Sequence, residues 1–332
     1  MIPLSVLDLV PIREGSDAHD ALAQACALAR VAEEAGYRRY WVAEHHATPG
    51  IAGGATAVVL AAIGHATRMI RIGAGGIMLP NHNPFVIAEQ FGTLDALFPG
   101  RVDLGLGRAP GAAPILGQAL RKDLGRAAEY FPQDVVELRA LLTGDIDLPI
   151  SATPGLGAKV DLWMLGSSLF GAQLAARLGL PYAFASHFAP DHLDAALATY
   201  REQFQPSAQL DQPYAVAAMT VICADTDSEA ELLASSQDQA FVRLRTGDPG
   251  KLPPPLPHYR QSLSLSERGM LERLGAARAV GSPQTVRDKI ARFVERTRAD
   301  EIIVSGATFD PLARQASLRL TMEAVGGTAL AA

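Results

Sequence analysis

Cysteine is scarce in this sequence of 332 residues, since only Cys26 and Cys223 are present and they lie far apart. Their number and spacing exclude a disulfide scaffold and a cysteine-based zinc site. Basic residues are also in the minority: 29 Lys and Arg stand against 35 Asp and Glu, which gives a net charge of −6. We therefore expect no nucleic-acid partner and no anionic membrane surface as a partner, because both require a basic protein surface.

Long apolar runs are absent too. No run approaches the roughly 18 residues that predict a membrane-spanning helix, and the first residues, MIPLSVLDLVP, lack the basic start of a signal peptide. We therefore expect a cytoplasmic protein. Hydrophobic residues make up 48% of the chain and charged residues 19%, which is enough for a large core. No Pro/Gly/Ser linker separates two halves, so residues 1–332 are interpreted as a single domain.

Short apolar segments alternate with helical patterns along the chain. Eight segments are predicted to be strands, at residues 3–10, 37–44, 70–79, 102–106, 163–166, 182–186, 215–223 and 301–305. Repeated strand-then-helix units predict parallel strands, because parallel neighbours need a crossover connection. Eight such strands favour a (β/α)8 TIM barrel, an α/β fold, over the alternative of an open doubly wound sheet.

Two segments interrupt the alternation, at about residues 109–160 and 246–281. The second contains GDPGKLPPPLPHY, which has too many prolines for a helix or a central strand. Insertions after barrel strands lie at the catalytic end of the barrel and can cover it. A disordered connector is the alternative interpretation.

Chemically useful residues gather where the predicted strands end, which is where a barrel builds its active site. Glu44, His45 and His46 end the second strand. Because side chains alternate along a strand, His45 shares one side with Trp41, whereas His46 shares the other side with Glu44. We expect one histidine to face the pocket and handle a proton. A hydrogen-bonded structural pair is the alternative. No metal site is predicted, because neighbouring strand residues diverge.

The next strands end in further candidates. The Gly-Ala-Gly-Gly segment at 73–76 interrupts the third strand, and marks either the close approach of a ligand or tight packing. Arg108 follows the fourth strand and is suited to a phosphate or to a surface ion pair. The Gly-Ser-Ser segment at 166–168 leads into a helix, as a phosphate cradle or an ordinary N-cap. Ser186 ends the sixth strand.

Taken together, these segments resemble the bacterial-luciferase-like flavin-dependent monooxygenases, in their single-subunit oxidoreductase branch. The stretches that carry the resemblance are AEEAGYRRYWVAEHH (32–46), IRIGAGGIMLPNHNPFVIAEQFGTLDALFPGRVDLGLGR (70–108), MLGSSLFGAQLAARLGLPYAFASHF (164–188), and VGSPQTVRDKI with DEIIVSG (280–306). The resemblance implies a barrel that binds FMN, which a separate flavin reductase supplies in reduced form. It further implies reaction with O2 through a flavin hydroperoxide that oxygenates a small aldehyde-like or ketone-like substrate.

The resemblance also implies residue roles. His45 matches the catalytic histidine, and the bond between Ala74 and Gly75 matches a non-prolyl cis peptide beside the flavin ring. Arg108 and Ser168 match residues that bind the FMN phosphate. The cofactor contacts predicted on this basis come from Ala74, Gly75, Arg108, Gly166, Ser167, Ser168, Gly171 and Ser186.

Some positions depart from the family pattern. Gly107 stands where the light-emitting luciferase subunit has a reactive cysteine, and Ser167 replaces an acidic residue, so light emission is in doubt. A deazaflavin-dependent dehydrogenase and a non-catalytic flavin-binding protein remain alternatives. Helices predicted at 55–67 and 84–98 are rich in apolar residues. The resemblance favours a homodimer built on them, and burial against the barrel wall is the alternative.

Overall fold

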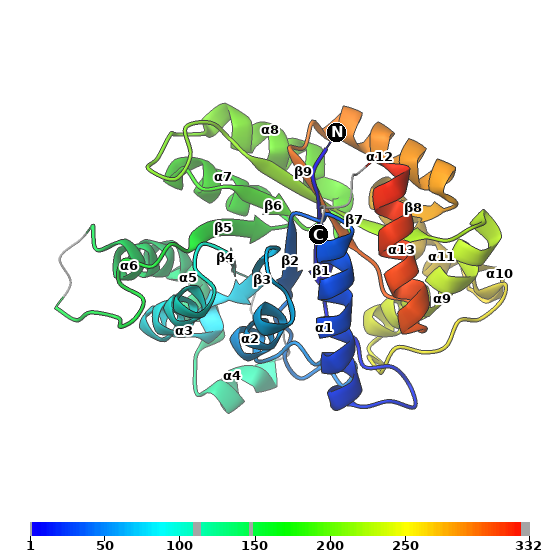
Figure 1. The fold of residues 1–332 in the computed structure, drawn as a ribbon, viewed down its shortest axis with the longest axis horizontal. Coiled ribbons are helices and arrows are strands. Elements are labelled where there is room, and N and C mark those ends of the chain that lie inside the picture. The colour runs from blue at the N-terminus through cyan, green and yellow to red at the C-terminus, as the bar shows by residue number, and fades with distance from the viewer. Residues whose placement is uncertain (1, 109–113, 146–148, 327–332) are drawn as a thin grey trace.

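Eight parallel strands form a closed barrel that is surrounded by helices (Figure 1). The computed structural model describes residues 2–108, 114–145 and 149–326. In order around the barrel, the strands are β1 (Leu4–Asp8), β2 (Arg39–Val42), β3 (Arg71–Met78), β4 (Val102–Gly107), β5 (Asp161–Gly166), β6 (Tyr182–Phe184), β7 (Ala215–Cys223) and β9 (Glu301–Ser305). The barrel closes because β6 pairs with β7 and β9 pairs with β1. This confirms the predicted (β/α)8 fold and excludes an open sheet.

A ninth strand, β8 (Arg278–Gly281), is not predicted by the sequence pattern. It pairs only with the last four residues of β7 and lies outside the closed ring. Its first residue carries a charge, which obscures the apolar pattern. Arg278 is nevertheless buried, because its guanidinium Nη1 lies 2.7 Å from the buried Asp238 carboxylate.

The helices between the strands follow the expected pattern closely. α1 (Ala18–Glu34) begins after Asp17, whose side chain accepts the Asp20 N–H, and it is followed by Gly36 at φ +89°. That left-handed conformation favours glycine and turns the chain toward β2. The other helices of the outer layer are α2 (Thr56–Ala66), α3 (Pro84–Leu97), α7 (Leu169–Leu178), α8 (Leu193–Gln203), α9 (Asp227–Thr246), α12 (Pro283–Thr297) and α13 (Pro311–Ala324). Among the residues that the structure describes, no helix is long and apolar enough to cross a membrane.

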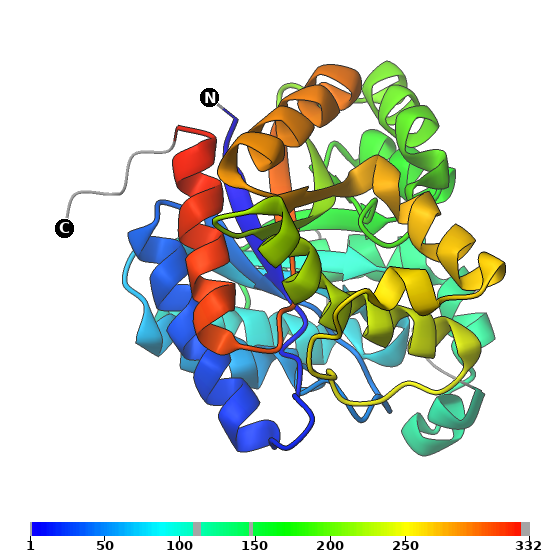
Figure 2. The ribbon, with the colours of Figure 1, turned by 90° about the vertical axis from the view of Figure 1, so that its right-hand side faces the viewer.

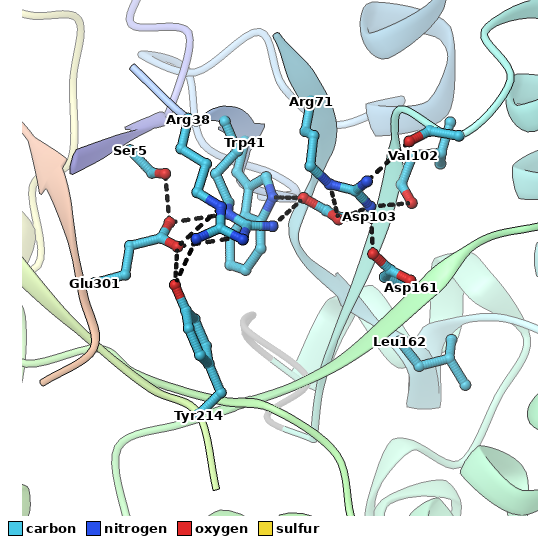
Figure 3. A network of polar contacts seen from close by, with 12 residues as sticks. Ser5, Arg38, Trp41, Arg71, Val102, Asp103, Asp161, Leu162, Tyr214 and Glu301 are labelled. Atoms are coloured by element: carbon cyan, nitrogen blue, oxygen red, sulfur yellow. Dashed lines mark hydrogen bonds and ion pairs between the residues drawn. The ribbon is translucent and has the colours of Figure 1, made fainter. Parts of the chain in front are cut away.

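The barrel interior has two layers. An apolar layer in the middle includes Leu7, Trp41, Trp163 and Ile303. The end that is formed by the first residues of the strands holds an ionic network instead, in which Arg39 pairs with both Asp103 and Glu301. Figure 3 shows the two carboxylates of this network with their neighbours Arg71 and Tyr214. The ionic network fills the barrel at the N-terminal ends of the strands. The opposite end, where the strands finish, is therefore available for a ligand-binding site.

Both predicted insertions contain structure. In the first, α4 (Pro114–Leu120), α5 (Leu124–Glu129) and α6 (Phe131–Thr143) are present, whereas residues 109–113 and 146–148 lie outside the described residues. The second contains α10 (Tyr259–Ser262) and α11 (Leu265–Arg273) after the proline-rich stretch.

The proline-rich stretch packs on loops at the C-terminal end of the barrel. The Leu252 N–H donates to the Ile12 carbonyl, and the Glu14 N–H donates to the Leu252 carbonyl, both at 2.8 Å. A Cβ on Gly50, in the loop after β2, would lie 2.1 Å from the Gly250 carbonyl oxygen. These contacts join the stretch to the loops after β1 and β2, so it is not a disordered connector.

Candidate active site

His45 lies just after β2, at the end of the barrel where the strands finish. Trp41 and Ala43, which share its side of the chain, belong to the apolar layer inside the barrel. The Nδ1 atom of His45 is buried and has no hydrogen-bond partner among the described residues. Burial lowers the pKa of His45, so the ring is neutral at pH 7. A neutral imidazole with an uncommitted nitrogen is suited to accept or donate a proton.

Glu44 and His46 point to the other side, as the alternation predicts. The buried Glu44 Oε1 lies 2.5 Å from His46 Nε2 and 2.8 Å from His82 Nε2, and Oε2 accepts the Met78 N–H at 3.1 Å. Burial raises the pKa of the Glu44 carboxyl, but hydrogen bonds from His82 and His46 outweigh burial and lower it. The sequence left two interpretations of these histidines open, a pocket-facing histidine and a hydrogen-bonded structural pair. His46 is in a structural pair, and His45 is not.

His82 is a participant that the sequence reasoning missed. It follows β3 through the short 3₁₀ helix η1 (Leu79–Asn81), and the only sequence signal is its place after the third strand. Ligand atoms of Glu44, His46 and His82 all lie within 4.8 Å of one another. Both histidine nitrogens, however, lie closer to one carboxylate oxygen than the roughly 3.3 Å that separates neighbouring ligands of a tetrahedral zinc ion. The arrangement has the geometry of a hydrogen-bonded triad.

A second partly buried histidine, His187, follows β6 and lies near His45. Its Nδ1 atom is also buried without a partner among the described residues. Burial, and to a lesser extent the neighbouring His45, lower the pKa of His187 to about 4. The site therefore brings together two neutral imidazoles that come from opposite parts of the sequence.

The low pKa of His187 predicts an acid-dependent loss of stability. The native ring stays neutral down to about pH 4, whereas an unfolded histidine takes up its proton near pH 6.5. The unfolded state therefore binds more protons below that pH, and stability falls as the pH falls from about 6.5 toward 4. We expect the native protein to lose about 1 to 2 kcal/mol more than His187→Gln between pH 7 and pH 5, measured by urea unfolding. Equal losses in the two proteins would contradict the burial of a neutral ring.

Arg108 and the start of α7 meet at one rim of the same end of the barrel. The exposed Arg108 follows β4, and its guanidinium carbon lies 4.1 Å from the ring centroid of Phe170, in the first turn of α7. Ser168 is the N-cap of α7, yet its hydroxyl makes no capping hydrogen bond. A Cβ on Gly166 would meet no atom closer than 3.7 Å. A cation, a hydroxyl group and the N–H groups of a helix start are thus available together.

The glycine-rich part of β3 is tightly packed. A Cβ on Gly75 would lie 2.6 Å from Leu7 Cδ1, and one on Gly76 would lie 2.6 Å from the Gly105 carbonyl oxygen. The cis peptide bond predicted between Ala74 and Gly75 is wrong by one residue, since it lies between Gly75 and Gly76. This is where the register of β3 with β4 shifts, between Ala74 and Ile77. Ala74 is buried in the outer core, so only its main chain is left for a cofactor contact.

The other predicted contacts differ in their surroundings. Ser167 is partly exposed beside Ser168. A Cβ on Gly171 would lie 3.4 Å from the Tyr182 ring, so this glycine allows close contact between helix and strand. Ser186 is fully buried, and its hydroxyl donates to the Ala218 carbonyl at 2.5 Å. Its hydroxyl therefore joins β6 to β7 within the wall and does not point to the Arg108 rim.

Comparison with known proteins identifies the family. The family model described as luciferase-like monooxygenase matches residues 2–301. The chain belongs to this family. A luciferase-like monooxygenase of Escherichia coli (strain K12) is 48% identical over 323 residues, which cover 97% of this chain and 96% of the relative.

Solved structures agree with this assignment. The crystal structure of apo-MsnO8 has a TM-score of 0.88 and 35% identity, and covers 99% of this chain and 100% of its own. The oxygenating constituent of 3,6-diketocamphane monooxygenase of Pseudomonas putida, solved in complex with FMN, has a TM-score of 0.70 and 18% identity over 99% of both chains. The second likeness is one of fold.

Proposed function

We propose that the protein is an FMN-dependent monooxygenase that takes reduced FMN from a separate reductase and uses O2 to oxygenate a small aldehyde-like or ketone-like substrate. The observation that carries the proposal is the rim where Arg108, Ser168 and the start of α7 converge. The proposal is also in keeping with the family and with the FMN complex of a protein of the same fold.

The residues at the rim suit a phosphate monoester. The Arg108 guanidinium supplies several donors in a planar fork, and contact with Phe170 holds it beside the helix. The uncommitted Ser168 hydroxyl and the free N–H groups of α7 add neutral donors where the helix dipole is positive. In this proposal Arg108, Ser167 and Ser168 hold the phosphate, while Gly166 leaves room for it.

The other end of the cofactor would lie toward the histidines and the glycine-rich part of β3, against the main chain of Ala74 and Gly75. When bound, reduced FMN supplies the electrons that activate O2. His45 then holds or delivers a proton at its Nδ1 atom, which no described group engages. Trp41, Trp163 and the loops covered by the proline-rich stretch keep water away from this atom, and dry surroundings strengthen polar interactions.

Binding of FMN to Arg108→Gln tests the proposal. We expect the dissociation constant to rise about 10-fold to 100-fold, because hydrogen bonds to charged groups contribute about 1.5–3 kcal/mol each. Isothermal titration calorimetry with oxidised FMN, and with reduced FMN without air, measures this directly. Arg30→Gln, on the exposed side of α1, is the matched control. Unchanged affinity in Arg108→Gln would remove Arg108 from the site, and no binding to the native protein would end the proposal.

The same protein samples distinguish FMN from a deazaflavin as the cofactor. An FMN-dependent monooxygenase consumes O2 when it is given reduced FMN and an aldehyde or ketone. A deazaflavin-dependent dehydrogenase instead binds the reduced deazaflavin and transfers a hydride without O2 uptake. A non-catalytic flavin-binding protein would bind FMN and do neither.

The remaining expectations stay predictions. The homodimer is supported by exposed apolar side chains on α2 and α3, namely Val58, Val86 and Leu97. A cytoplasmic location and a reductase partner follow from the proposed reaction and from composition.

A further inference from the structure

A hollow of about 300 Å³ lies on the outer wall of the barrel, apart from the strand ends that form the candidate active site. Its floor is formed by Met219 of β7 and Phe293 of α12, and one side by the 3₁₀ helix η3 (Leu274–Ala277). α8 lies beside α12 in both ribbon views (Figures 1 and 2), and the Arg201 side chain of α8 donates to the Thr297 carbonyl at the end of α12. The volume corresponds to about ten water molecules and matches the lower limit of small-molecule pockets.

The charged groups that line this hollow are all basic. They are Arg278 of β8 and Lys289, Arg292 and Arg296 of α12. The three from α12 are spaced by three and four residues, so they lie along one face of the helix. The same helix also carries the acidic residues Asp288 and Glu295. Each directly precedes a basic residue of the hollow, so it is rotated about 100° round the helix axis from that residue.

The acidic groups near the hollow neutralise only part of this charge. Arg278 is matched by Asp238, at 2.7 Å. Arg296 lies 3.7 Å from Asp194 of α8, but that carboxylate is 64% exposed, so water and salt screen the pair. Among the described residues, Lys289 and Arg292 have no acidic partner within 4.0 Å. Glu231 also lies 4.0 Å from Arg278, and Asp227 attracts Lys289 from farther away. Lys289 and Arg292 are therefore the two cations of the hollow that lack a close acidic partner among the described residues.

Two of these cations are held in place by neutral groups. Lys289 Nζ donates to the Val280 carbonyl at 2.9 Å, and Arg296 Nη2 donates to the Ala276 carbonyl at 3.1 Å. A carbonyl uses one donor of each side chain and cancels none of its charge. The cations are thus partly fixed before any ligand arrives, which reduces the entropy that an anion would lose on ordering them.

Arg292 and Arg296 are exposed, as basic residues on an ordinary solvated helix face are. This face differs from an ordinary one in having a hollow with an apolar floor beneath the basic side chains. Here Met219 and Phe293 are buried beneath the cations, at 2% and 4% exposure, so one wall suits the carbon skeleton of a ligand while the rim suits its charge. Phosphate groups carry the high charge density and the acceptor oxygens that Lys and Arg bind best.

We propose that this hollow is a second binding site, for a small phosphorylated metabolite with at least two negative charges, whose phosphates contact Lys289, Arg292 and Arg296. It is independent of the flavin chemistry. The site is separate from the Arg108 rim, so the two can be tested apart.

Titration of the flavin-free protein with pyrophosphate, and in parallel with ADP, tests the site by calorimetry at low ionic strength. The principal variant is Arg292→Gln, because the exposed Arg292 side chain makes no hydrogen bond or ion pair with the described residues, so we expect the fold to be kept. We expect pyrophosphate affinity to fall at least 5-fold in Arg292→Gln and at least 10-fold in Lys289→Gln/Arg292→Gln. Arg30→Gln is expected to bind as the native protein does.

Arg108→Gln distinguishes this site from the flavin phosphate rim, where pyrophosphate also has a place to bind. Binding that survives in Arg108→Gln and is lost in Arg292→Gln supports the hollow. Binding that is lost only in Arg108→Gln, equal binding in Arg292→Gln and Arg30→Gln, or no binding at millimolar pyrophosphate would each overturn the proposal. None of these outcomes bears on whether FMN binds at the rim.

Discussion

Arg39→Met is expected to lower the free energy of unfolding by about 3–5 kcal/mol, the cost of removing one partner from a buried ion pair. The Arg39 side chain is 3% exposed, and it lies 2.8 Å from Asp103 and 2.9 Å from Glu301, two carboxylates with no exposure at all. Methionine fills a similar volume but supplies no charge. Two anions are then left in the barrel interior with fewer partners, and neither has water nearby to solvate it.

The remaining contacts limit the loss without preventing it. Asp103 keeps Arg71 and the Trp41 indole N–H, whereas Glu301 keeps the Ser5 and Tyr214 hydroxyls. The half-exposed Arg38, at 3.9 Å, is then the charged partner that Glu301 keeps, and water screens it. Urea unfolding at pH 7 measures the change.

A neighbouring arginine provides the control for this experiment. Arg38 is half exposed and lies 3.9 Å from Glu301, so Arg38→Met is expected to cost less than about 1 kcal/mol. Similar small losses in both variants would show that the network contributes little to stability. A loss in Arg39→Met that disappears when Glu301→Gln is added would locate the cost in the unpaired carboxylate.

Much of the barrel could be predicted because each of its strand–helix units is indicated by residues that are close together in the sequence. Each strand is a short apolar segment followed by a helix, and a closed barrel of such units places all the strand ends on one rim. That is why Arg108 and Ser168, far apart in the sequence, could be expected at the same end of the barrel, where Arg108 contacts Phe170 of α7. Their role in binding a phosphate is implied by the family resemblance and stays a prediction. Alternation along β2 likewise predicted that His45 and His46 point in opposite directions, as they do.

The missed features depend on contacts between distant segments. β8 was not predicted because its buried Arg278 interrupts the apolar pattern, and Arg278 is neutralised by Asp238 of α9, far away in the sequence. His82 joins Glu44 only through the turn after β3, and Ser186 meets Ala218 only because β6 and β7 close the barrel. The cis peptide bond was predicted one residue too early, and it lies where the register of β3 with β4 shifts. None of these partners can be read from residues near in sequence.

His45→Ala is expected to reduce product formation by about 100-fold to 10,000-fold, the usual contribution of a positioned acid or base. The ring lies above the apolar layer, is neutral through burial, and has an uncommitted Nδ1 atom. Removing it takes away the proton carrier at that position, and His46 cannot replace it, since His46 is engaged by Glu44 and faces the opposite side. O2 consumed in the variant should then appear as hydrogen peroxide and no longer as oxygenated product.

The measurement is the ratio of product to O2 consumed, with reduced FMN and an aldehyde or ketone that the native enzyme oxygenates. FMN affinity should change less than 3-fold, because the proposed phosphate contacts come from Arg108 and α7 rather than from β2. The exposed His258, in the proline-rich stretch, gives the control His258→Gln, which should keep the native ratio. An unchanged ratio in His45→Ala would remove this histidine from proton transfer. A fall in the ratio of product to O2 consumed, together with loss of FMN binding, would show instead that His45 holds the cofactor.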